Sequence, residues 1–114
     1  MAVTDADSGK SLATPAIGDG PDATGFDAKN QVAFSSNSDG TLTVVNAAKG
    51  GGYNVIQTVK TQKGGRTMAF DSGNGKVYVV VAEYGPVPAA TAAVPHPRPV
   101  ATPGSFSVMV IARK

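Results

Sequence analysis

The single histidine is the residue of this chain with the widest range of possible chemistry. His96 lies in the stretch VPHPRPV, and the chain contains no cysteine. A hydrolytic triad would need this histidine beside an activated nucleophile, and no Gly-x-Ser-x-Gly turn occurs in the sequence. A metal site would need three or four ligands, and neither a second histidine nor a nearby acidic residue accompanies His96. We therefore predict no catalytic residue and no metal ligand, and we interpret His96 as an exposed loop residue.

The acidic residues are the remaining candidates for acid–base catalysis or calcium binding. They are Asp5, Asp7, Asp19, Asp22, Asp27, Asp39, Asp71 and Glu83. Most occupy turn positions that aspartate prefers because its side chain binds the nearby backbone. The segments DADSG (5–9) and DSGNG (71–75) resemble the start of a calcium loop but lack the bidentate acid at its far end. We therefore expect structural turn roles for these acids.

The glycine-rich segment KGGR (63–66) has the composition of a phosphate-binding loop. It precedes a strand-like segment instead of a helix, so it lacks the helix N-terminus that binds phosphate. Its counterpart earlier in the chain, GDGPD (18–22), also lies between two strand-like segments. We interpret both segments as connectors.

Composition favours a single all-β domain. The chain has 114 residues with 14 glycines, 8 prolines, 6% aromatic and 16% charged residues, which suits short strands joined by tight turns. The net charge is +2 without a basic cluster, so we expect no nucleic-acid partner. No apolar stretch approaches the roughly 20 residues of a membrane-spanning helix, and MAVTDADSGK does not have the pattern of a signal peptide.

The chain repeats itself at an interval of 44 residues. The stretch GPDATGFDAKNQVAF, which begins at Gly20, returns as GGRTMAFDSGNGKVYV, which begins at Gly64. A further segment, GTLTVVNA (40–47), resembles GSFSVMVIA (104–112) at an offset near 64. The difference predicts an insertion of about 20 residues, which we place at 85–103, where six of the eight prolines lie.

Each copy of the repeat is predicted to form short strands separated by turns. The Asp-Gly pair at 39–40 predicts a hairpin because both residues tolerate a positive φ. Residues 2–17 are predicted to form the end of a third strand, a turn and a fourth strand that ends at Ile17. The other predicted strands cover 23–27, 31–36, 41–46, 53–59, 66–71, 76–84 and 105–114. Four strands in a period of about 44 residues are typical of a β-propeller blade.

The sequence resembles the YVTN-repeat β-propellers, a branch of the lactonase-like and surface-antigen propellers. The matching segments are Val3-Thr4-Asp5-Ala6, Ser8-Gly9-Lys10, Ile17-Gly18, Gly20-Pro21, Phe26-Asp27, Val32 to Asn37, Asp39-Gly40-Thr41 and Val44-Val45-Asn46. The second copy departs from the family where Gly65 stands in place of proline and where VYVVVAEY lacks the family's asparagine. The resemblance covers nearly the whole chain outside 85–103 and implies a fold, but it is almost silent about function.

The resemblance implies about two blades per chain. Residues 1–17 are interpreted as the outer strand of a shared blade, 18–59 as a complete blade, and 60–114 as a second blade that carries the proline-rich insert 85–103. Two blades leave apolar sheet faces uncovered, and propellers need closure. We therefore expect either a homo-oligomer, joined through blade faces and exchange of terminal strands, or a piece of a longer propeller.

Four residues are the candidates for a ligand-binding face. In propellers, loops between the second and third strands share one face with the connectors between blades, which predicts that Asp22, Arg66, His96 and Arg98 lie on one rim. The stretches PVP and PHPRP in the insert favour polyproline II, which is either a ligand for aromatic-lined grooves or a rigid surface loop.

Three functions follow from these expectations. The first is a non-enzymatic binding or scaffold module that assembles with itself, has no cofactor and has an unidentified small ligand at most. The second is an enzyme of the lactonase-like or quinoprotein-like propeller class with a metal or cofactor at the channel mouth. The third is a propeller fragment without a separate activity. Proteins of the resembling family are often secreted or periplasmic, and the sequence leaves the compartment open.

Overall fold

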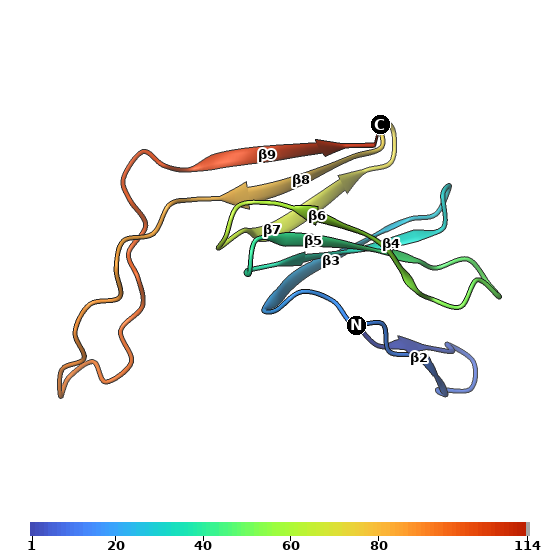
Figure 1. The fold of residues 1–114 in the computed structure, drawn as a ribbon, viewed down its shortest axis with the longest axis horizontal. Coiled ribbons are helices and arrows are strands. Elements are labelled where there is room, and N and C mark those ends of the chain that lie inside the picture. Colours follow the sequence, from blue (N-terminus) through green and yellow to red (C-terminus); the bar gives the residue numbers. More distant parts are fainter. Residues whose placement is uncertain (114) are drawn as a thin grey trace.

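The computed structural model describes residues 1–113 and consists of three antiparallel sheets (Figure 1). The N-terminal hairpin contains β1 (Val3–Thr4) and β2 (Ser11–Ala13). The four-stranded sheet contains, in spatial order, β3 (Pro21–Asp27), β4 (Val32–Asn37), β5 (Thr41–Asn46) and β6 (Val55–Lys60). The three-stranded sheet contains β7 (Arg66–Asp71), β8 (Lys76–Val81) and β9 (Ser107–Ala112). The described part of the chain is thus all-β, as predicted, and it holds no helix that is long and apolar enough to cross a membrane.

The strands predicted from the repeat are confirmed, with shorter ends at β2, β6, β8 and β9, the last of which begins at Ser107 instead of Ser105. β2 ends at Ala13 instead of Ile17, because Pro15 has no N–H group to donate to a ladder. β6 begins at Val55 instead of Tyr53, whose φ of 49° does not fit an extended strand. β8 ends at Val81, and beyond it only an isolated bridge forms before the chain enters the insert.

The hairpin between β4 and β5 is confirmed, but its turn differs from the predicted one. Asn37 is opposite Thr41, so the loop has three residues, 38–40. Of these only Gly40 has a positive φ, 94°, and its N–H donates to the carbonyl of Asn37 at 3.2 Å. A two-residue type I′ turn needs positive φ at both central positions, whereas a three-residue loop needs it only at the last. The glycine is therefore essential to this turn, and the aspartate has a different role.

The four-stranded and three-stranded sheets pack face to face around one apolar core. Phe34, Leu42 and Val44 from the first of these sheets meet Val77 and Val79 from the second. The rings of Phe34 and Phe70 approach to 5.3 Å between centroids. In Figure 1 the three-stranded sheet lies on one side of the four-stranded sheet, and the N-terminal hairpin lies on the opposite side.

The two large sheets repeat the same strand pairing. Asp27 is opposite Val32 in the four-stranded sheet, and Asp71 is opposite Lys76 in the three-stranded sheet, an interval of 44 residues at both positions. In both hairpins four residues separate the paired positions, and the last of the four has a positive φ. The repeat found in the sequence is therefore also a repeat of strand register.

The third strand of the repeat follows an interval of 66 residues, which corrects the predicted offset of 64. Thr41 is opposite Asn37, and the equivalent residue opposite Val81 is Ser107. A shift of two residues leaves every side chain on the same face of a strand, because side chains alternate with a period of two. The apolar pattern therefore could not distinguish the two alignments, and strand pairing selects the longer interval.

Candidate functional site

Two of the four predicted rim residues lie at neighbouring strand ends. Asp22 is near the start of β3, and its carboxylate accepts a hydrogen bond from the backbone N–H of Thr67 at 2.5 Å. Thr67 follows Arg66 at the start of β7 and has a φ of 58°, which is strained for a β-branched residue. The strand register shifts at this point in β7, which turns the Thr67 N–H out of the ladder and toward the other sheet. Asp22 therefore has a structural role in joining the two sheets.

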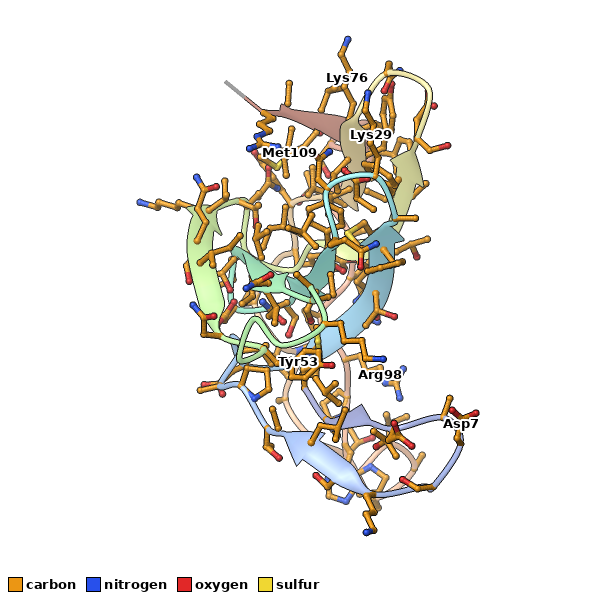
Figure 2. The ribbon with its side chains drawn as sticks, turned by 90° about the vertical axis from the view of Figure 1, so that its right-hand side faces the viewer. Asp7, Lys29, Tyr53, Lys76, Arg98 and Met109 are labelled. Carbon is orange, nitrogen blue, oxygen red and sulfur yellow. The ribbon has the colours of Figure 1, made fainter. Side chains whose placement is uncertain are left out.

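The other two predicted rim residues lie on a long arm. His96 and Arg98 are exposed within the segment 85–103, which extends away from the sheets beyond the ends of β8 and β9 (Figure 1). Arg98 is labelled in Figure 2. Among residues 1–113, no hydrogen bond connects either side chain to Asp22 or Arg66. The structure thus groups Asp22 with Arg66 and carries His96 and Arg98 away on the arm.

The arm is paired at its base and at its tip. At the base, the N–H of Gly85 donates to Val100 at 3.0 Å, and the N–H of Thr102 donates to Glu83 at 2.8 Å. At the tip, Thr91 and Val94 exchange two backbone hydrogen bonds of 3.1 Å. Five of the six prolines of the arm lie between these points, where the two sides of the arm form no ladder. The arm is therefore a long, narrow loop whose residues are mostly exposed.

Four of the eight acidic residues, Asp5, Asp27, Asp39 and Asp71, perform the predicted turn roles. The Asp27 carboxylate accepts hydrogen bonds from the Asn30 side chain at 2.6 Å and from the backbone N–H groups of Lys29 and Asn30. The Asn30 side chain is the main cause that lowers the pKa of Asp27, against the opposing effect of burial. In the same way the Thr41 hydroxyl lowers the pKa of Asp39, and the Ser8 hydroxyl lowers the pKa of Asp5. Their oxygens already serve neighbouring turns, and across residues 1–113 no cluster of three metal-binding side chains forms.

These lowered pKa values predict a loss of stability in acid. A carboxyl group with a lower pKa in the folded state stabilises the fold above its unfolded pKa, near 3.9, and loses this effect as the pH falls through the folded pKa. The melting temperature should therefore decrease when the pH is lowered below about 4. In the Asp27→Asn variant this decrease should be smaller. The control is Asp7→Asn, at the tip of the N-terminal hairpin (Figure 2), where no hydrogen bond to the carboxylate is present. Equal slopes for the two variants would contradict the role of Asp27.

The glycine-rich segment 63–66 is a connector, as predicted. The N–H of Gly64 donates to the carbonyl of Ser38 at 2.8 Å, and the N–H of Gly65 donates to Gln62 at 3.2 Å. Gly64 has a φ of 81° and packs against the ring of Tyr84. Because both N–H groups already bind protein carbonyls, this segment has no free cradle for phosphate.

A groove of about 780 Å³ separates parts of the two large sheets, and sequence reasoning did not predict it. Its walls combine apolar residues such as Val32, Val59 and Ile111 with polar ones. Polar residues at the groove, such as Asn30 and Asn46, are already bonded to neighbouring turns. The groove therefore has volume but few free polar groups with which to select a ligand.

The largest unexplained feature is the outer face of the three-stranded sheet. We define the outer face as Tyr78, Val80, Phe106, Val108 and Val110, which alternate with the residues that point into the core. Val108 is 48% exposed and Val110 is 55% exposed. A row of apolar side chains that faces solvent indicates a contact surface.

The repeat shows which surface the outer face corresponds to. Val108 and Val110 are equivalent to Leu42 and Val44 at the interval of 66 residues. Leu42 and Val44 belong to the face of the four-stranded sheet that is buried against the three-stranded sheet. The outer face thus repeats the chemistry of a buried interface, but nothing in residues 1–113 covers it in the same way.

A hollow of about 330 Å³ lies at one end of the outer face. Arg66, Tyr84 and Phe106 line it, together with residues at the base of the arm. Sequence reasoning placed Arg66 on a ligand-binding rim, and the structure places it beside an apolar surface. The apolar side chains at alternate positions in residues 106–110 were the signal that could have identified this surface. The pairing of β9 with β8 was needed to show which side of β9 faces the core.

Comparison of the chain with protein-family models, with curated proteins and with solved structures found no match.

Proposed function

We propose that this chain is a non-enzymatic binding and scaffold module, built as two β-propeller blades, that assembles with copies of itself into a closed ring. The single observation that carries the proposal is the outer face, with Val108 and Val110 exposed in the positions that Leu42 and Val44 occupy in a buried interface. In this proposal each large sheet is one blade. The packing between the two large sheets of one chain then recurs between neighbouring chains of the ring.

The packing within the chain supports a second copy as the partner. The four-stranded sheet already demonstrates that a face of this composition packs against a sheet of this repeat. The opposite face of the four-stranded sheet bears Phe26, which is half exposed. In a head-to-tail arrangement the exposed part of this face around Phe26 covers the outer face of the next copy, since the rest of the face, with Ser35, Thr43 and Val45, is already buried within its own chain. Such a heterologous contact closes into a ring when the rotation per copy divides the circle.

The experiment is a measurement of the mass of the chain in solution by light scattering after size-exclusion chromatography. We expect a discrete assembly of two or more chains. Val110→Lys should convert it to single chains, because a lysine on the outer face would be buried without a partner. The matched control is Val94→Lys on the arm, since Val94 is 52% exposed and lies outside the outer face, and this variant should keep the mass of the parent.

Two results would contradict the proposal. A folded single chain at concentrations up to the millimolar range would show that the outer face has no affinity for another copy. An assembly that survives Val110→Lys unchanged would show that a different surface joins the copies. A discrete assembly that only the outer-face variant dissociates is the expected result.

A further inference from the structure

The N-terminal hairpin is a shortened copy of the hairpin formed by β5 and β6. Thr4 is opposite Ser11, and Val45 is opposite Val55 in the equivalent position. In both hairpins the register shifts at the residue before this pair. In each hairpin the next residue along the first strand then donates its N–H to a carbonyl across the turn. Asp5 donates to Lys10 at 2.8 Å, and Asn46 donates to Asn54 at 2.9 Å. β1 is therefore equivalent to the end of β5, and β2 is equivalent to β6.

The three-stranded sheet has no equivalent of β6. Its order is β7-β8-β9, and β9 is equivalent to β5. In the part of the chain that the structure describes, no strand pairs with the free edge of β9. An edge strand with unpaired N–H and C=O groups is a template for a further strand.

The hairpin cannot supply this strand to its own sheet. Figure 1 shows the hairpin and β9 on opposite sides of the four-stranded sheet. The two strands of the hairpin are held to each other by two paired positions and by further bonds between Met1 and Pro15 and between Asp5 and Lys10, and a two-stranded hairpin of this length is only marginally stable.

We infer that β2 of one copy pairs antiparallel with β9 of a second copy and releases its own β1. This inference rests on the proposed assembly and specifies its strand pairing. Thr4 and Ile111 are both equivalent to Val45, so β1 and β9 compete for one position beside β2. The pairing of β5 with β6 gives the register between copies: Ala13 opposite Val110, and Thr14 opposite Met109. It ends there because Pro15 cannot donate to the ladder.

The test uses disulfide formation, because the chain has no cysteine of its own. Residues directly opposite in an antiparallel pair have Cα atoms about 4.5–5.5 Å apart, which is within the range of a disulfide. Two chains, one Ala13→Cys and one Val110→Cys with a size tag, are refolded together and oxidised. We expect loss of the single-chain bands and a mixed dimer that reductant reverses. Thr14→Cys with Met109→Cys serves as the second in-register pair.

The matched control combines Ala13→Cys with Met109→Cys, which places the two thiols on opposite faces of the sheet and should form no mixed dimer. Light scattering on the unmodified chain separates the two proposals. An assembly without crosslinking in either in-register pair would overturn the strand exchange and leave the proposed function standing. A folded single chain would overturn both.

Discussion

Replacing Leu42 with alanine is expected to lower the free energy of unfolding by about 3 kcal/mol. Leu42 is 1% exposed and lies in the core between the two large sheets. Its removal loses the transfer free energy of the buried methyl groups and leaves a cavity between two sheets whose backbones cannot close around it. Urea denaturation followed by circular dichroism, at one fixed protein concentration, measures the change.

The control for this prediction is Leu12→Ala in the N-terminal hairpin. Leu12 is 49% exposed and lies on the short strand β2. Its truncation should change the free energy of unfolding by no more than about 0.5 kcal/mol. Equal losses for the two variants would mean that the core between the large sheets does not stabilise the chain as described.

Replacing Asn37 with alanine is expected to cost a similar amount, about 3 kcal/mol, for a polar reason. Asn37 is fully buried at the end of β4. Its Nδ2 donates to the hydroxyls of Thr41 and Thr43 at 3.0 Å and lies 3.2 Å from the carbonyl of Ser35, whose own hydroxyl donates to Asn37 Oδ1 at 3.0 Å. Alanine would leave several buried polar groups without a partner, and each carries a desolvation penalty.

This network also fixes the connector that precedes the four-stranded sheet. The N–H of Gly18 donates to the hydroxyl of Thr43 at 3.2 Å, and the N–H of Asp19 donates to Asp39 at 2.7 Å. A Cβ atom at Gly18 would overlap the Thr41 hydroxyl, so glycine is required at this close approach. Loss of Asn37 should therefore loosen the connector as well as the sheet.

The control for Asn37 is Asn54→Ala, at an exposed position before β6 where the side chain forms no hydrogen bond in the described structure. It should change stability by less than about 0.5 kcal/mol in the same urea experiment. Val81 occupies the position equivalent to Asn37 in the three-stranded sheet, where the core is apolar. If Asn37→Ala cost no more than Asn54→Ala, the buried network would have no net stabilising effect.

Local sequence determined the strands and most turns of this protein. The interval of 44 residues, the β-branched runs and the Asp-Gly and Gly-rich segments predicted seven strands close to their observed places, because side-chain alternation and positive φ act within a few residues. The acids in turns were predicted for the same reason, since an aspartate binds the backbone two or three residues away, as Asp27 does.

Only the tertiary structure decided the alignment of β9, the separation of the rim residues and the outer face. An offset of 64 or 66 residues preserves the same alternation, so strand pairing with β8 was needed to select 66. Asp22 and Arg66 were expected to share a rim with His96 and Arg98, but no local rule gives the direction in which a long insert leaves a sheet. The exposure of Val108 and Val110 likewise depends on which sheet packs on which face, and that is a property of contacts between distant segments.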